Sequence, residues 1–257
     1  LDVETGDVVW RVDFVSKLKA PAPAFGFVSS PLLDGDALYV QAGGGVVKLN
    51  KRNGDIFWQT LSQGDGMYGS AFSSPVIAEI AGQRQLVVQT RQQLAGVDLE
   101  TGETLWAQDV PAFRGMNILT PTVWNDRIFT SSYGGKSFLY SVRRDTNQFH
   151  VDSEWENKVQ AYMSSPVVID GYAYLHLRNR RFTCIDLSTG QEQWITKPFG
   201  EYWSMIAQGN RILALDERGD LMLIAANPAE FELIDQRKVS DDSAWAHLAN
   251  DQDQLFV

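Results

Sequence analysis

The sequence predicts an all-β protein: a β-propeller built from four-stranded antiparallel blades. Two phrases recur along the chain. One is a turn of the form Asp-x-x-Thr-Gly with Trp four residues after the Gly, and the other is a Ser-Ser-Pro-like phrase ahead of it. Both return at intervals of roughly 40 to 48 residues, the length of one propeller blade. A third observation is that no segment shows a sustained apolar period of 3.6 residues, so helix is expected to be scarce.

The turn phrase has a physical reading as a hairpin. Asp and Thr side chains can bond the turn backbone, and Gly supplies the positive φ that the reversal needs. A fifth Trp, at position 155, keeps its place in a more degenerate unit. The recurring positions are Gly6 with Trp10, Gly54 with Trp58, Gly102 with Trp106, Gly190 with Trp194, and Trp155.

The complete unit is clearest over residues 164–196, where four strand-like runs are separated by turn signals. We expect one β-propeller domain over residues 1–257, because repeat units cannot bury their faces singly. Its predicted units cover residues 25–58, 72–106, 118–155, 162–196 and 203–239, with a composite blade formed by 244–257 and 1–14. This gives about six blades here and leaves a full-length protein of seven or eight blades open.

Composition restricts the class of partner. The 257 residues carry a net charge of −10, which argues against nucleic acid or an anionic membrane surface as the main partner. Cys184 stands alone in an apolar run, so we expect a buried small hydrophobe and no disulfide within the chain. No apolar run approaches about 18 residues, and no transmembrane segment is predicted.

Together, Ser-Ser-Pro, Asp-Gly, aromatic-rich strands and Asp-x-x-Thr-Gly-x-x-x-Trp resemble the pyrroloquinoline-quinone-like β-propeller repeat over essentially the whole chain. Two groups share this repeat: the quinoprotein alcohol and sugar dehydrogenases, and the non-catalytic BamB-like propellers of outer-membrane assembly. The resemblance implies that each Trp docks between neighbouring blades with its indole N–H on a backbone carbonyl. It alone implies a periplasmic or exported location and a membrane-associated complex.

Binding residues are expected on the face formed by the connections between blades and the turns between second and third strands, because loops on a rigid scaffold carry function. The connections place aromatic side chains just before the innermost strands. They can plug the mouth of a channel by packing on each other, or they can line a funnel for a ligand or partner side chain. The candidates are Phe27, Tyr68, Phe113, Tyr162, Tyr202, Trp203 and Trp245, with Asn117 and His247 in the same loops.

Cations are also predicted on this face of an otherwise acidic chain. Guanidinium groups suit carboxylates, so this set favours an acidic ligand or acidic peptide; the alternative is ordinary solvated turn residues. The candidates are Arg91, Arg114, Lys136, Arg178, Arg180 and Arg218.

Catalysis is not favoured by the residues present. A quinoprotein dehydrogenase, by the same resemblance, needs a carboxylate base, a calcium ion with several oxygen ligands, and in many members a vicinal disulfide. The single Cys184 excludes that disulfide, and the connecting loops show no cluster of acidic and amide residues. We therefore expect no catalytic residue, no metal site and no cofactor. Pyrroloquinoline quinone with calcium belongs only to the alternative interpretation.

The sequence thus predicts a non-catalytic, BamB-like scaffold for a protein partner or a small acidic ligand. The first alternative is a quinone-dependent alcohol or sugar dehydrogenase, or a degenerate relative of one. A third option is a carbohydrate-binding propeller, because aromatic funnels also stack sugar rings.

Overall fold

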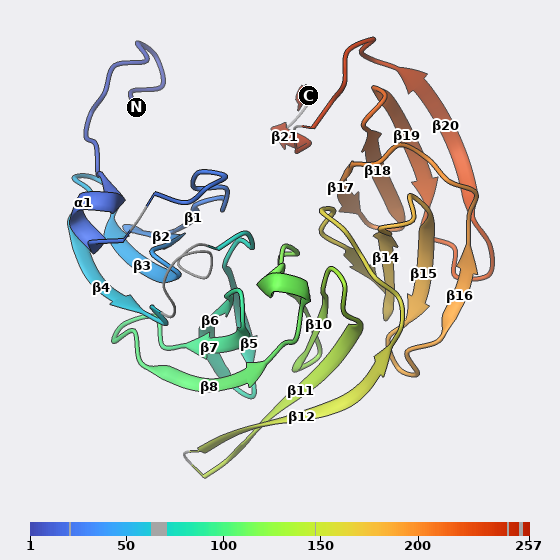
Figure 1. The fold of residues 1–257 in the computed structure, drawn as a ribbon. Helices are drawn as coiled ribbons and strands as arrows, with labels where there is room; N and C mark the ends of the chain where they lie inside the picture. Colours follow the sequence, from blue (N-terminus) through green and yellow to red (C-terminus); the bar gives the residue numbers. More distant parts are fainter. Residues whose placement is uncertain (21, 63–70, 147, 246, 252–253) are drawn as a thin grey trace. The chain divides into compact units, whose positions relative to one another are not determined.

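A computed structural model describes residues 1–20, 22–62, 71–146, 148–245, 247–251 and 254–257 (Figure 1). Within these residues the only helical segments are α1 (Phe14–Leu18) and the 3-10 turn η2 (Phe113–Gly115). The strands form five four-stranded antiparallel sheets and one two-stranded hairpin. The predicted all-β class is confirmed.

Each four-stranded sheet is a meander, in which every strand pairs with its neighbours in the sequence. The first sheet contains β1 (Leu32–Asp34), β2 (Ala37–Ala42), β3 (Gly45–Asn50) and β4 (Ile56–Thr60). The second contains β5 (Val76–Ile80), β6 (Gln83–Gln89), β7 (Gln93–Val97) and β8 (Thr104–Asp109). The third contains β9 (Thr122–Trp124), β10 (Arg127–Ser131), β11 (Ser137–Asp145) and β12 (Gln148–Asn157).

The last two meanders and the hairpin complete the chain. The fourth sheet contains β13 (Val167–Ile169), β14 (Tyr172–His176), β15 (Phe182–Asp186) and β16 (Glu192–Ile195). The fifth contains β17 (Trp203–Gln208), β18 (Arg211–Asp216), β19 (Asp220–Ala225) and β20 (Glu232–Lys238). The hairpin is β21 (Ala249–Asp251) with β22 (Gln254–Phe256). A four-stranded meander is the form of one propeller blade.

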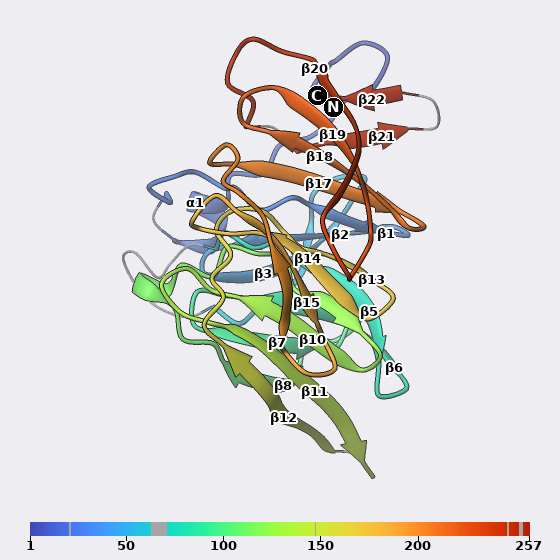
Figure 2. The same ribbon diagram turned by 90° about the vertical axis from the view of Figure 1, so that its right-hand side faces the viewer.

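The chain divides into two compact units. Unit 1 comprises residues 1–121 and 142–151, and holds the first and second sheets. Unit 2 comprises residues 122–141 and 152–257, and holds the fourth and fifth sheets, the hairpin and most of the third sheet. Residues 142–151, where β11 ends and β12 begins (Figures 1 and 2), are the part of the third sheet that belongs to unit 1.

Each unit has its own apolar interior, supplied mainly by second and third strands. β7 is buried along its whole length, which means that other side chains cover both of its faces. The interior of unit 1 includes Tyr39, Leu86 and Val97. In unit 2, Phe182 and Ile212 belong to the corresponding cluster. Cys184 is buried there as a free thiol, as expected, and burial raises its pKa to about 12.

The turn phrase forms a self-capped hairpin. Asp98 Oδ1 accepts hydrogen bonds from the backbone N–H groups of Glu100 and Thr101, both at 2.9 Å. These bonds hold the pKa of Asp98 below its usual value. Gly102 closes the turn at φ +76°, a conformation that other residues rarely adopt. Asp2 binds Glu4 and Thr5 in the same way at the first copy.

Each turn glycine past the first copy lies under the tryptophan ring of the preceding copy of the repeat. A Cβ at Gly190 would lie 2.6 Å from the Trp155 ring, and Trp155 Nε1 donates to the carbonyl of Leu187 at 2.8 Å. In unit 1, Trp58 lies against Gly102 in this way. The other indoles on backbone carbonyls are Trp10 on Lys51, Trp58 on Leu99 and Trp194 on Asn227.

Trp106 departs from the implied pattern. Its Nε1 donates to the side-chain oxygen of Gln85 at 2.6 Å, not to a backbone carbonyl. Gly96 lies beside this pair, and a Cβ there would come within 2.1 Å of both the Gln85 oxygen and the indole nitrogen. The second sheet therefore binds the indole of its own outer strand through a buried amide.

The fifth sheet lacks the turn phrase, and Phe231 supplies apolar packing near its outer strand. The Phe231 ring lies 5.9 Å from that of Trp194, whereas Leu233 and Ile234 are exposed. At the chain ends, β21 pairs with β22, and the described residues before Phe14 form no strand. The composite blade of 244–257 with 1–14 stays a prediction.

Candidate functional site

In unit 2, four aromatic side chains from four different loops lie in a continuous row. We call Tyr133, Tyr162, Tyr202 and Trp245 the aromatic row. The ring centroids are 5.4 Å apart for Tyr133 and Tyr162, 5.7 Å for Tyr162 and Tyr202, and 4.4 Å for Tyr202 and Trp245. Tyr133 comes from the β10–β11 turn and the others from connections between sheets, so the loops predicted to share one face meet within this unit.

The two ends of the aromatic row differ in chemistry. At one end the Arg178 guanidinium lies 4.4 Å from the centre of the Tyr133 ring, a cation–π contact. At the other end the Trp245 side chain is 67% exposed. In the middle, burial and the neighbouring Tyr202 raise the pKa of Tyr162 to about 12. From one end to the other, the row therefore consists of a cation, packed phenol rings and an exposed indole.

A buried carboxylate anchors the loop that carries Tyr202. Asp216 Oδ2 accepts from Gly200 N at 2.6 Å and from the indole nitrogen of Trp203 at 3.0 Å. Asp216 Oδ1 accepts from Arg218 N at 2.7 Å. A Cβ at Gly200 would lie 2.5 Å from this carboxylate, so the loop needs glycine there for the backbone to come this close.

Trp203 was predicted on the binding face, but only 4% of its side chain is exposed. It is the first residue of β17, and consecutive strand residues point to opposite sides, so Tyr202 reaches the surface while Trp203 packs inward. Its ring stacks on His176 at 5.0 Å. Burial lowers the pKa of His176 to about 4, against the opposing attraction of Asp216. Trp203 is a packing residue.

Three of the cations predicted in unit 2 are bound by neighbouring groups. Lys136 is paired with Glu156, and Arg180 with Glu201 at 2.9 Å. Arg218 donates to the Phe199 carbonyl at 3.2 Å. In unit 2, Arg178 is the exposed candidate whose guanidinium lies on an aromatic ring.

In unit 1 the predicted site residues pack differently. Arg91 is buried, lies 4.5 Å from the centre of the Phe72 ring and donates to the Arg114 carbonyl at 2.6 Å. Asn117 is also buried, and its Nδ2 donates to the carbonyls of Arg91 and Val110. Arg114 has φ +53° and lies over the half-exposed Phe113. Arg91 and Asn117 thus hold loop backbone in place.

The remaining candidates have separate environments. Phe27 makes an edge contact with Phe14 at 5.6 Å in unit 1. His247 is exposed. Tyr68 lies outside the described residues.

Sequence reasoning missed four residues of this region: Tyr133, Glu156, Glu201 and Asp216. Tyr133 lies in the β10–β11 turn and not in a connection between sheets, so the aromatic pattern of those connections does not include it. Glu156 and Glu201 lie 20 and 21 residues from the cations that they bind, and Asp216 lies 16 and 13 residues from Gly200 and Trp203, so no local pattern marks these contacts. Among the described residues, no group of three or more His, Cys, Asp and Glu is placed to hold a metal ion.

Repeated meanders, tryptophan rings on turn glycines and a loop face rich in aromatics define a propeller that presents its loops for binding. The chain belongs to the family described as "Outer membrane protein assembly factor BamB", which matches residues 1–196. This match covers the first four sheets, including all the copies of the turn phrase.

Individual proteins resemble the chain in sequence and in fold. The chain is 23% identical to the outer membrane protein assembly factor BamB of Yersinia pestis, over all of this chain and 70% of that protein. It superposes on BamB from Moraxella catarrhalis with a TM-score of 0.72 and 17% identity, covering 99% of this chain and 73% of that one. The fold is a β-propeller.

A quinohemoprotein alcohol dehydrogenase from Comamonas testosteroni gives a TM-score of 0.55 at 12% identity, covering 83% of this chain and 43% of that one. At this identity the likeness concerns the fold alone.

Proposed function

We propose that this chain is a non-catalytic β-propeller scaffold that docks a protein partner on the aromatic row of unit 2. The observation that carries the proposal is the continuity of the row, from Arg178 over Tyr133 to the open indole of Trp245. Tyr, Trp and Arg are the residues that most often supply the binding energy of protein interfaces. The rings are fixed by mutual packing, so little conformational entropy is lost on docking.

Family membership supports the scaffold role. The family and the Yersinia pestis relative are both described as outer membrane protein assembly factors. We therefore propose that the chain is exported and works in a membrane-associated complex that assembles outer-membrane proteins. Neither helical segment in the described part of the chain has the length and apolar character needed to cross a membrane.

Site-specific photocrosslinking tests the docking face. Trp245 is replaced by the photoreactive p-benzoylphenylalanine in the full chain, and crosslinked adducts from cell envelopes are identified by mass spectrometry. We expect an adduct with a component of the outer-membrane assembly machinery. The matched control places the same group at Phe57, an exposed aromatic of β4 in unit 1, and should give none. Equal adducts at both positions, or none at Trp245, would contradict the proposal.

A further inference from the structure

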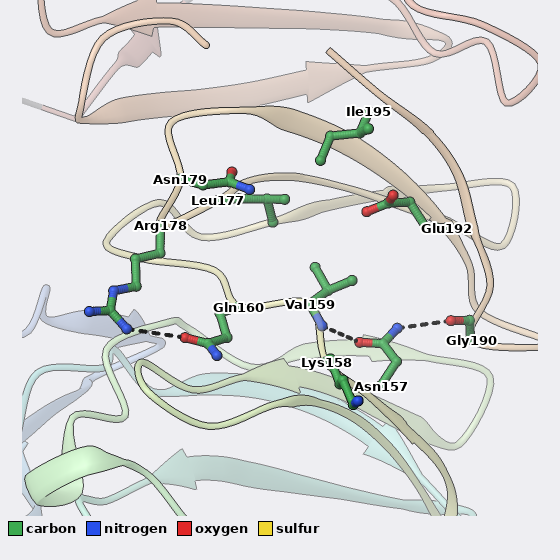
Figure 3. A pocket seen from close by; sticks show the side chains of 10 residues that line it. All are labelled: Asn157, Lys158, Val159, Gln160, Leu177, Arg178, Asn179, Gly190, Glu192 and Ile195. Carbon is green, nitrogen blue, oxygen red and sulfur yellow. Dashed lines mark hydrogen bonds between the residues drawn. The ribbon is translucent and has the colours of Figure 1, made fainter. Parts of the chain in front are cut away.

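An open groove of about 590 Å³ lies in unit 2 where the end of β12 and the segment after it face the β14–β15 turn and β16 (Figure 3). This volume falls in the range of ligand-binding sites. The lining residues are Asn157, Lys158, Val159, Gln160, Leu177, Arg178, Asn179, Gly190, Glu192 and Ile195. Arg178 belongs both to this groove and to the end of the aromatic row.

The groove is formed by two sheets that are fastened to each other. Asn157 Nδ2 donates to the Gly190 carbonyl at 2.8 Å, and Asn157 Oδ1 accepts from Val159 N at 3.0 Å. The indole of Trp155 is bound to the Leu187 carbonyl nearby. These contacts fix the outer strand of the third sheet against the turn of the fourth. A ligand therefore meets a preformed site, which lowers the cost of binding.

The groove has an apolar middle and charged ends. Figure 3 shows Leu177, Val159 and Ile195 lying between Arg178 on one side and Glu192 on the other. Ile195 is 42% exposed although it is a strand isoleucine. Among the residues that the structure describes, neither Lys158 nor Glu192 takes part in an ion pair. An apolar surface and an available lysine are thus both open to an added ligand.

We propose that this groove binds an extended peptide segment of a partner in which an acidic side chain lies next to an apolar one. The carboxylate meets Arg178, Lys158 adds a second positive charge to the lining, and the apolar side chain covers Leu177 and Ile195. Arg178 is available for a carboxylate because its guanidinium is exposed and its groove-side contact is a long hydrogen bond of 3.4 Å to Gln160. The inference rests on the proposed scaffold role and names the chemistry of a second contact beside the aromatic row.

The probe is the hexapeptide Asp-Asp-Leu-Leu-Gly-Gly amide with fluorescein on its N-terminal amine; the full-length chain is titrated into it and binding is followed by fluorescence anisotropy. Two matched peptides replace either both Asp by Lys or both Leu by Ser. The chain has a net charge of −10, so non-specific attraction would favour the Lys peptide. We expect the opposite order, with the Asp-Leu peptide binding best. Tighter binding of the Lys peptide, or none by the Asp-Leu peptide at about 1 mM, overturns the proposal.

Variants then locate the peptide. Lys158→Glu should weaken binding about 5-fold, because it replaces an attraction by a repulsion. Ile195→Ser should weaken it about 10-fold through lost apolar burial. Glu192→Gln should strengthen it about 2-fold. The control Arg211→Glu makes the same kind of charge change at an exposed residue at the start of β18, and should have no effect.

The pattern of losses separates this inference from the docking proposal. If the four variants bind the peptide alike, the groove is not its site, whatever the crosslinking at Trp245 shows. If the crosslinking fails while the variants behave as stated, the groove binds the peptide and the docking face of the proposed function is wrong. Circular dichroism of each variant identifies any loss that comes from unfolding.

Discussion

The tryptophans over the turn glycines and the aromatic row use similar side chains for opposite purposes. The Trp155 ring lies on the backbone of Gly190, its N–H donates to the Leu187 carbonyl, and its centre is 6.0 Å from that of the Phe129 ring, so these contacts hold it within unit 2. Trp245 contacts Tyr202, donates to Ser243 and leaves most of its surface open. The difference indicates that an indole packed on a turn glycine stabilises the fold, whereas an indole without that contact keeps its surface available for binding.

Truncating one tryptophan from each set should give the largest contrast. Trp155→Ala should lower the free energy of unfolding by about 3–5 kcal/mol, because a large ring and its hydrogen bond are removed from a packed site. Trp245→Ala should change it by less than about 1 kcal/mol. Urea denaturation followed by far-ultraviolet circular dichroism measures both. Similar losses in the free energy of unfolding for the two variants would show that the two tryptophans do not differ in their contribution to the fold.

Gly190 should contribute to stability in two ways, through its positive φ and through the close contact of its backbone with the Trp155 ring. Gly190→Ala should cost about 2–4 kcal/mol, because alanine at φ +73° is strained and its Cβ meets the Trp155 ring. Gly82→Ala is the matched control, since Gly82 has φ +74° but nothing within 4 Å of its Cβ position. It should cost only about 1–2 kcal/mol. Equal costs in thermal or urea unfolding would mean that the ring contact contributes nothing.

The interior stack in unit 2 predicts an acid-sensitive stability. The pKa of His176 falls from 6.5 to about 4 on folding, so the unfolded chain binds a proton at a pH where the folded chain does not. The part of the free energy of unfolding that depends on a neutral His176 is fully present above about pH 6.5 and is lost as the pH falls toward 4. Between pH 7 and pH 5 it should amount to about 2 kcal/mol.

His176→Phe removes the titration and keeps an aromatic ring against Trp203. Its stability relative to the parent should therefore rise by about 2 kcal/mol as the pH is lowered from 7 to 5. His247→Phe, at an exposed position, should show no such change. A pH profile of unfolding that is the same for His176→Phe and the parent would refute the assignment to His176.

What could be predicted follows from how local the determining contacts are. The turn at Asp98 is closed by groups within four residues of one another. The bond from the backbone N–H two residues on recurs at Asp2, Asn50 and Asp186. The blade pattern could therefore be predicted from sequence alone. The indole of Trp106 instead finds Gln85, an amide on another strand, and no repeat phrase marks that partner.

The candidate face was predictable only in outline. Alternation along a strand puts either Tyr202 or Trp203 at the surface, and the choice depends on Asp216, which takes the Trp203 indole. Burial of Arg91 likewise depends on a carbonyl 23 residues away. Contacts of this kind join residues that are distant in sequence, so the pattern of neighbouring residues does not predict them. The site residues themselves remain predictions that crosslinking and peptide binding can test.

The spacing of the tryptophan contacts has a consequence for synthesis of the chain. The indoles of Trp10, Trp58, Trp155 and Trp194 each bind a backbone carbonyl further along the sequence, 41 residues ahead for Trp58 and 32 for Trp155. The hairpins are closed by near neighbours and can form as soon as they leave the ribosome. The indole N–H of these tryptophans therefore has no carbonyl partner until most of the next sheet has been synthesised. We expect nascent chains halted within a sheet to bind chaperones through that exposed indole, and to release them once the next turn glycine has emerged.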